Sequence, residues 1–512
     1  MSAVTVTRAT GPGWLPGQGQ NAIDRETLWY DWALGDDDPQ PPSWVQRGEQ
    51  GSMDLPSHPT PGELLCSPGA ARRWPGTTGR LEAVSFPTAA PSPAVARPDD
   101  LVRLSAAALT PVRRDPSDPF NDHRAYPSPR CLFPVRGLVE SGGQWHLMDP
   151  RRRELVATGA AADQGWLALV GDYPAIPSGY HWSRGSLVAI ETGIVLRHCA
   201  ALAQALLGRG LVAELPSVGT TGPGVLGALR ERERWSNPVY VRLRKDDERS
   251  CRTEGYAAVR RLGAGAAEVR HDDDSLSDVG RVYGSHLVTP ELSEVDLPGL
   301  PEGRSPRMDS WAEVLWRRSS GRMPNGLYGY RLALRAVGAG QLEEQLRWAR
   351  VRAGGALGEV LDLMTLRAVV RDVDGWEPGV YRATASGLVR EHPASVAGLD
   401  LLAEAYSMGA MPNAANDFGR APLVWLISSR PRAVVDRLGP AGWSVLQTAT
   451  GWVCQGIGLA AAGQSLVARP MRSRDESALE RSLHLPPDEM VGLAVVVGHH
   501  QPHGGPQIDL RT

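Results

Sequence analysis

Arginine residues occur at three places that suit the binding of an anion, at two of them together with serine. A guanidinium group presents a fixed fork of N–H donors that matches a phosphate or a carboxylate. The simpler alternatives are a solvated basic turn after a helix, an ordinary loop before a helix, and a terminal arginine that binds nothing. The residues are Arg317, Arg318, Ser319 and Arg322 in one segment, Arg472 and Ser473 in a second, and Arg511 near the last residue.

The composition is that of an ordinary globular chain, and it argues against several classes of protein. Of the 512 residues, 42% are hydrophobic and 22% are charged, and 54 Lys+Arg against 57 Asp+Glu give a net charge of −3. A dedicated nucleic-acid binder would carry a basic excess. The five cysteines are scattered without a Cys-x-x-Cys pair, which argues against a disulfide framework or a zinc ribbon. Because we find neither a signal peptide nor a membrane span, we expect a cytoplasmic protein.

The periodicity of apolar residues predicts the elements that would position these side chains. We expect helices over 101–109, 187–208, 445–463 and 477–483; the second and third are apolar on nearly all sides and end in glycine. The expected strands cover 132–139, 145–148, 166–170, 366–370, 379–382, 423–427 and 491–497. Residues 1–90 are loop-rich, and we assign them to no element.

The same order of elements occurs twice along the chain. When the sequence is shifted by 255 residues without a gap, Cys199 falls on Cys454 and Gly208 on Gly463. The alternative is a chance likeness between two helices rich in alanine and leucine. The matching order of elements on both sides favours an internal repeat. We therefore predict two homologous halves, 1–245 and 246–512, with a polar connector near 245–274.

The second half resembles the nitroreductase-like flavoprotein family. In order along the chain, the resemblance is carried by the Arg-Arg-Ser segment at 316–322, the strands at 366–382, the segment 470–485, and the strand at 491–500 followed by Arg511. It implies an α+β fold in which a mostly antiparallel sheet is flanked by helices. It also implies FMN bound at a dimer interface. A chain of two tandem halves would then be an intrachain pseudo-dimer, which leaves open whether this unit pairs again as a homodimer.

Two segments narrow the resemblance to the azoline dehydrogenases of peptide-modifying gene clusters. The run from Asp374 to Tyr381 reads Asp-Gly-x-x-Pro-Gly-Val-Tyr, and Pro127-Ser128 opens a segment similar to the family's Pro-Ser flavin loop. The resemblance implies oxidation of thiazolines or oxazolines to azoles on a ribosomally synthesised precursor peptide, with FMN as the acceptor. It also implies two partners, the peptide itself and a cyclodehydratase or leader-binding protein.

The two halves keep complementary parts of the family's pattern. The second half has the Arg-Ser opening but lacks Pro-Ser at 353–356, whereas the first half has Pro127-Ser128 but no arginine at 90–93. In the family, the opening and the loop of one site come from opposite subunits. The alternative is that the two halves have lost parts of the pattern at random. Otherwise, the resemblance implies one FMN per chain. Its ligands would be Arg317, Arg318, Ser319, Arg322, Arg472, Ser473 and Arg511 from the second half, and Pro127, Ser128 and Arg130 from the first.

Oxidation of an azoline needs a base that takes the Cα proton while a hydride leaves for the flavin. The family's Lys-Tyr pair before the long helix is incomplete in both halves. The first half keeps the tyrosine in Gly179-Tyr180-His181 but lacks the lysine, and the second has Arg437 for the lysine and Leu438 for the tyrosine. Because the pKa of arginine lies above ~12, Arg437 is a poor base. Tyr180 or His181 is the better candidate, although Tyr180 would also suit a buried position with a satisfied hydroxyl.

Two other functions stay open at this point. One is a flavin reductase that transfers electrons from a nicotinamide donor to quinones or nitroaromatics. The other is a flavin-free scaffold of a biosynthetic complex, because one of the two expected sites has lost its motifs. We expect no metal site, since His499 and His500 are consecutive in a strand and would face opposite sides.

Overall fold

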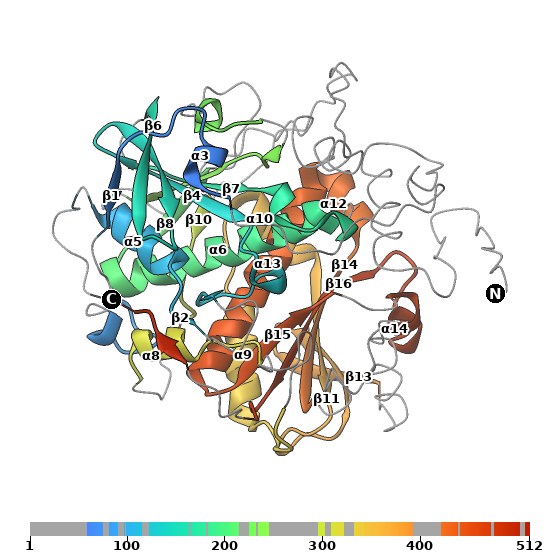
Figure 1. The fold of residues 1–512 in the computed structure, drawn as a ribbon. Helices are drawn as coiled ribbons and strands as arrows, with labels where there is room; N and C mark the ends of the chain where they lie inside the picture. The colour runs from blue at the N-terminus through green and yellow to red at the C-terminus, as the bar shows by residue number, and fades with distance from the viewer. Residues whose placement is uncertain are drawn as a thin grey trace, which may run out of the picture.

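Two antiparallel sheets and two long helices make up most of the part of the chain that the structure describes (Figure 1). The structure is a computed structural model, and it describes residues 59–74, 81–90, 97, 99–114, 122–162, 165–180, 183–214, 225–231, 234–244, 295–302, 309–321, 332–392, 421–438, 441–472, 476–501 and 507–511. The candidate residues His181, Arg322 and Ser473 lie outside these ranges, as does the expected connector.

The first half contributes most of an eight-stranded sheet with the order β1-β6-β5-β4-β7-β9-β8-β10. Its strands are β1 (Ala71–Arg73), β4 (Val135–Ser141), β5 (Gln144–Asp149), β6 (Glu154–Ala161), β7 (Leu167–Gly171), β8 (Leu211–Glu214), β9 (Val239–Leu243) and β10 (Val295–Leu297). The helices of this half are α3 (Pro61–Leu64), α5 (Asp100–Leu109) and the long α6 (Ser183–Leu207). Strand β10 follows the expected boundary at 245 and yet completes the sheet of the first half by pairing with β8.

The second half forms a six-stranded sheet with the order β13-β12-β11-β14-β16-β15. Its strands are β11 (Met364–Val370), β12 (Gly379–Thr384), β13 (Gly387–His392), β14 (Leu423–Ser429), β15 (Val467–Met471) and β16 (Met490–Gly498). The helices are α8 (Trp311–Arg317), α9 (Ala339–Ala349), α10 (Gly355–Leu363), α12 (Pro431–Leu438), α13 (Ala441–Gly463) and α14 (Glu476–Ser482).

The two sheets repeat one topology, as the sequence repeat predicts. The order β6-β5-β4-β7-β9-β8 in the first sheet corresponds strand for strand to β13-β12-β11-β14-β16-β15 in the second. In both halves the long helix follows the strand β7 or β14 in the sequence and precedes β8 or β15. The prediction of an α+β fold built from two tandem halves is confirmed. Seven strands of the two large sheets were not predicted: β1, β6, β8, β9 and β10 in the first and β13 and β15 in the second.

The long helices α6 and α13 pack against each other near the middle of each helix. A Cβ atom on Gly193 would lie 1.9 Å from the carbonyl oxygen of Thr448, and one on Gly451 would lie 1.9 Å from that of Ile190. Residue numbers rise on one helix as they fall on the other, so the helices cross antiparallel. Positions 193 and 448 are 255 apart and are therefore equivalent in the repeat. Contact between equivalent positions is what a pseudo-two-fold axis requires.

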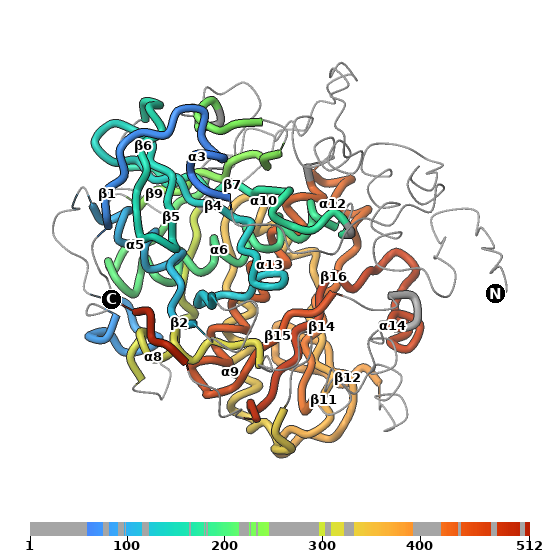
Figure 2. The backbone as a smooth tube through the Cα atoms, in the orientation of Figure 1, coloured from blue at the N-terminus to red at the C-terminus, as the bar shows by residue number. Residues whose placement is uncertain are grey.

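Each half also lends a segment to the other. Strand β17 (Ile508–Asp509), near the last residue of the chain, pairs with β2 (Arg113–Arg114), which in turn pairs with β3 (Asp122–His123) of the first half. The tube in Figure 2 places this red end of the chain beside the blue first half. In the opposite direction, the Phe86 ring stacks on Trp348 at 5.2 Å and meets Trp311 edge-on at 4.8 Å. Exchanged segments of this kind join the halves into one folding unit.

The glycines that end the long helices have different roles. Gly208 adopts a left-handed φ of 63° directly after α6, as a glycine cap does. Gly463 is instead the last residue of α13, and Ser465 takes the left-handed conformation with a φ of 59°. A Cβ atom on Gly463 would lie 2.5 Å from the Phe86 ring, so this position is glycine because of packing between the halves.

Helix α6 is long and apolar enough to cross a membrane by length and composition. However, 94% of its most apolar 18-residue window is buried inside the structure. Burial of this kind is ordinary for the central helix of a protein core, so α6 does not by itself indicate a membrane span.

Candidate functional site

Arg318, in the Arg-Ser segment, reaches the first half with its side chain. Helix α8 begins after Ser310, whose Oγ accepts the Glu313 N–H at 3.3 Å, and Arg318 directly follows its last residue. The Arg318 side chain is buried, and its Nη2 donates to the carbonyl oxygens of Arg124 at 3.2 Å and Tyr126 at 3.1 Å. Burial, together with a smaller contribution from the neighbouring charge of Arg113, lowers the pKa of Arg318 to about 9.

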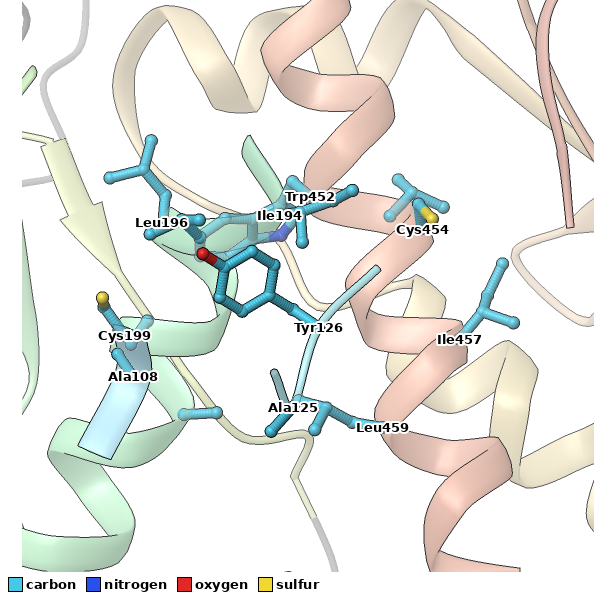
Figure 3. Packing of buried hydrophobic residues seen from close by; sticks show 14 of the residues in the cluster. Ala108, Ala125, Tyr126, Ile194, Leu196, Cys199, Trp452, Cys454, Ile457 and Leu459 are labelled. Carbon is cyan, nitrogen blue, oxygen red and sulfur yellow. The ribbon is translucent and has the colours of Figure 1, made fainter. Parts of the chain in front are cut away.

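The segment from Arg124 to Tyr126, just before the Pro-Ser pair, is also held by the two long helices. Gln455 of α13 donates from Nε2 to the carbonyl oxygen of Ala125 at 3.4 Å and lies 3.1 Å from Nδ1 of His198 on α6. Figure 3 shows the Tyr126 ring between side chains of these two helices. The Tyr126 hydroxyl accepts a hydrogen bond from Arg124 Nη1 at 2.7 Å. Side chains from both halves therefore fix the backbone that leads into the expected flavin loop.

The Pro-Ser pair opens a tight turn with an unusual backbone. Arg130, Cys131 and Phe133 have φ values of 48°, 55° and 51°, which non-glycine residues rarely adopt. Each such residue costs about 1–3 kcal/mol, which the surrounding structure must offset, and strain of this kind concentrates at functional sites. Ser128 ties the turn together, because its Oγ accepts the Phe133 N–H at 2.8 Å.

Glu191 of α6 contacts residues at both ends of the same turn. Its carboxyl group is fully buried and accepts the Ser128 hydroxyl at 2.5 Å, and the Val135 N–H approaches it at 3.4 Å. Burial raises the pKa of Glu191 to about 7, against lowering contributions from Ser128, Arg124, Val135 and Arg136. A carboxyl group that titrates near neutrality beside a strained turn has the character of a functional residue.

Tyr180 lies beside this turn. It ends the short helical turn Ser178–Tyr180 that precedes α6, and the Arg130 guanidinium lies over its ring at 5.8 Å from the centroid. Contact at this distance is within the range of a cation–π interaction. The structure thus brings together Ser128, Arg130 and Tyr180, three of the residues that the sequence singled out.

The positive charges of Arg124 and Arg318, which meet where the two halves join, suit the binding of an anionic group. The hydrogen bonds of Arg124 and Arg318 end on carbonyl and hydroxyl oxygens rather than on carboxylates. Within the described ranges, the Nε atom of each guanidinium is buried without a partner. Buried cations without a bound carboxylate are costly unless an anion compensates them. A phosphate, or the electron-rich edge of a flavin, would supply that compensation, so these residues fit the cofactor that the sequence resemblance implies.

Arg317 and Arg511 fit a phosphate less well. Arg317 pairs with Asp309 at 2.9 Å and with Glu313 at 3.9 Å. Arg511 pairs with Asp509 at 2.7 Å and with Glu313 at 3.1 Å, and it lies over the Trp316 ring. Two guanidinium groups thus share three carboxylates, and a dianionic phosphate would have to displace them. The phosphate-binding role of these arginines stays a prediction that this geometry does not favour.

The remaining candidates are spread over several elements. Ser319 accepts the Ala468 N–H of β15 through its carbonyl oxygen at 3.0 Å, which places it beside the strand that leads to the half-buried Arg472. Pro127 is buried in the turn described above. Arg437 lies on α12 with a side chain that is 63% exposed, and it pairs with Glu359 at 2.9 Å. In the second half, Gly354 and Gly355 lead into α10 rather than forming a turn like that at 127–133.

Four residues of this arrangement were missed in the sequence: Arg124, Glu191, His198 and Gln455. A signal was available for two of them. Glu191 and His198, like Arg197, lie in a largely apolar helix, and a charged or titratable residue in such a helix is rarely buried unless it is paired. Arg124 and Gln455 carried no comparable signal, since their roles depend on contacts between halves.

Comparisons with solved structures show the fold of most of the chain. No protein-family model matches the sequence, and no curated protein matches it either. Among solved structures, an Anabaena variabilis protein assigned as a nitroreductase matches with a TM-score of 0.63 and 14% identity, over 94% of this chain and 100% of that one.

Two partial matches are much weaker. A Ralstonia eutropha protein with the same assignment covers 40% of this chain and 89% of its own, at 17% identity and a TM-score of 0.29. A chain of the E. coli microcin synthetase McbBCD complex, solved with truncated pro-MccB17 bound, covers 33% of this chain and 67% of its own, at 14% identity and a TM-score of 0.29. Likeness at that level supports no inference about this chain. The full-length match extends over both halves, and the chain therefore has the fold of the nitroreductases.

Proposed function

We propose that this protein is a flavin-dependent oxidoreductase that binds one FMN between its halves and oxidises thiazolines or oxazolines to azoles on a ribosomally synthesised peptide. The observation that carries the proposal is the meeting of Arg318 from the second half with the 124–133 segment of the first, beside Tyr180. Nitroreductase-like folds suit a flavin, and the sequence resemblance to azoline dehydrogenases supplies the narrower reaction.

The chain offers different groups to the different parts of FMN. Arg318 and Arg124 carry the buried positive charge that would face an anionic part of the cofactor. The half-buried Ser128 and Arg130 would contact the cofactor from the turn of the first half. When bound, FMN supplies an acceptor for two electrons and a hydrogen. The protein must then orient the azoline ring and remove its Cα proton.

Tyr180 is our candidate for removing that proton, with His181 as its neighbour in the sequence. Oxidation of an azoline to an azole removes one hydride and one proton; bound FMN would supply the hydride acceptor and Tyr180 would take the proton. Molecular oxygen, reduced with two protons to hydrogen peroxide, would restore the oxidised cofactor. Arg130 over the Tyr180 ring would hold the phenol in place. Arg437 stays charged and is exposed beside Glu359, which makes it unsuitable as a base.

The proposal is tested by the absorbance of the purified protein between about 350 and 500 nm, where oxidised flavins absorb, and by the FMN-to-chain ratio after heat release. We expect a yellow protein with a ratio near one, and reduction of the flavin by an azoline-containing peptide without a nicotinamide donor. Bleaching by the nicotinamide donor alone would instead favour a reductase of quinones or nitroaromatics.

A colourless protein that binds no added FMN would favour the third possibility, a scaffold without flavin. One observation points that way: Arg317 and Arg511 are held in ion pairs with the protein's own carboxylates. As partners for the proposed enzyme, we infer the precursor peptide and a cyclodehydratase or leader-binding protein, in the cytoplasm. Co-purification of such a protein with the full chain would test that part.

A further inference from the structure

The hydrogen bond between Glu191 and Ser128 has a consequence for ligand binding at the turn. Ser128 is half-buried at the start of the turn, while Glu191 is fully buried beneath it on α6. The Ser128 Oγ lies 2.5 Å from Glu191 Oε2 and accepts the Phe133 N–H at 2.8 Å. All three groups belong to the first half, and the position equivalent to Glu191 in the second half is Leu446.

Counting donors and acceptors gives two states of this cluster. A hydroxyl group has one hydrogen to donate and two lone pairs that accept. When Glu191 is ionised, the single hydrogen of Ser128 goes to the carboxylate, and Phe133 uses one lone pair. When Glu191 is protonated, its own O–H can donate to the second lone pair of Ser128. The Ser128 hydrogen is then released for an acceptor outside the cluster.

We propose that Glu191 controls the direction of the Ser128 hydroxyl, so that a ligand which accepts a hydrogen bond from Ser128 is bound together with one proton. The proposal rests on the proposed function for the identity of that ligand, an FMN whose oxygen atoms accept the bond. Glu191 is in this sense a positioning residue that need not touch the ligand itself.

The groups around Glu191 keep its pKa near neutral pH. Arg124 precedes the turn and Arg136 lies on β4, and both lower the pKa of Glu191, which burial raises to about 7. The charge of Arg136 is partly compensated by Asp172 at 3.4 Å. Tyr126 and His198, on the neighbouring elements, stay neutral because burial raises the pKa of the first and lowers the pKa of the second to about 3. Both states of Glu191 are therefore populated near neutral pH.

The experiment is isothermal titration of the flavin-free full chain with FMN between about pH 5.5 and 8.5, in pairs of buffers with different ionisation enthalpies. For the parent protein we expect uptake of up to one proton per FMN above about pH 7, and a Kd that rises by up to about tenfold per pH unit there. Glu191→Gln should remove the proton uptake and flatten the profile, because the amide NH2 donates to Ser128 at every pH. Ser128→Ala should also flatten the profile, but with weaker binding at low pH.

A cofactor-free measurement separates failure of this inference from failure of the proposed function. A buried protonated carboxyl group gives an infrared C=O band, which should titrate near pH 7 in the parent, be absent in Glu191→Gln and shift in Ser128→Ala. Binding of FMN with the same pH slope in the parent and Glu191→Gln would overturn the inference and leave the proposed function standing. If FMN never binds but the band titrates and responds to Ser128→Ala, the coupling stands and the proposed function falls.

Discussion

The two halves share one strand order and differ in where they place polar groups. In helix α6 the buried residues Glu191, Arg197 and His198 stand where α13 has Leu446, Trp452 and Val453. Before the helices, the tyrosine of the expected Lys-Tyr pair is kept as Tyr180 in the first half and replaced by Leu438 in the second. The fold tolerates either set because backbone and apolar packing define it. The buried polar residues of the long helices can therefore lie on one side of the pseudo-two-fold axis, as expected if the chain has one composite site rather than two.

Removal of Arg318 is expected to have the largest effect on this asymmetric site. Arg318→Ala takes away the buried guanidinium and its two charge-assisted hydrogen bonds to the carbonyls of Arg124 and Tyr126, which hold the segment before the turn. At ~1.5–3 kcal/mol for each bond, losing the placement of that segment would weaken FMN binding by roughly 10²–10⁴-fold. The FMN-to-chain ratio after purification measures this. The sequence analysis names Arg317 as a ligand of the same site, but Arg317 is held by Asp309 and Glu313.

The matched control is therefore Arg317→Ala, together with the melting temperature of both variants. We expect Arg317→Ala to keep most of the flavin. If it loses the flavin while Arg318→Ala keeps it, the anionic end of FMN lies at the ion-paired cluster and not between Arg318 and Arg124.

The next largest effect is expected at Tyr180, where the two halves differ before the long helix. Tyr180→Phe should slow azoline oxidation by ~10²–10⁴-fold if the phenol takes or relays the proton. Flavin content should not change, because the ring and its contact with Arg130 are kept. Single-turnover reduction of the flavin by an azoline peptide measures the step. Equal rates for Tyr180→Phe and the parent would exclude Tyr180 from proton transfer.

A single added methyl group is expected to disrupt the contact between helices α6 and α13. A Cβ atom on Gly451 would lie 1.9 Å from the Ile190 carbonyl oxygen, and backbone cannot turn aside as a side chain can. Gly451→Ala should lower the free energy of unfolding by about 3 kcal/mol or more. Gly458→Ala, on the same helix, meets its nearest neighbour at 3.7 Å and should be neutral or stabilising by about 0.5–1 kcal/mol. Denaturant titration of both variants makes the comparison, and similar losses would mean that the helices do not cross at these glycines.

The sequence predicted both long helices and seven strands of the two large sheets, because the signals of these elements are local. It missed β6, β8, β9, β13 and β15, which also belong to these sheets. Strands β11, β14 and β16 and helix α13 begin and end within four residues of the expected bounds, since apolar runs and the repeat specify them. Strands β1, β10 and β17 have two or three residues each and pair with distant segments, so no local pattern could reveal them.

The candidate site was predictable only in part. Its residue types were recognised in Ser128, Arg130, Tyr180 and Arg318, but the choice between Arg317 and Arg318 depends on how the chain leaves α8. Arg317 is the last residue of α8 and pairs with Asp309. Arg318 follows the helix, and its side chain donates to the Arg124 carbonyl oxygen of the first half. That distinction is tertiary, and a motif read along the chain cannot contain it. Glu191 differs, because a lone carboxylate in an apolar helix is visible in the sequence.

The smallest effect is expected at Arg437, which precedes α13 as Tyr180 precedes α6. Its guanidinium pairs with Glu359 on the surface, and exposed pairs of this kind contribute about 0–1 kcal/mol. Arg437→Ala should therefore change the free energy of unfolding by less than about 1 kcal/mol and leave the rate of azoline oxidation within about twofold, because an arginine that stays protonated cannot act as the base. Steady-state oxidation of an azoline peptide by Arg437→Ala and Tyr180→Phe, measured side by side, tests the asymmetry directly. If Arg437→Ala is the slower variant, the reacting centre lies on the second half's side of the pseudo-two-fold axis. The conclusion that Tyr180 of the first half supplies the base would then be wrong.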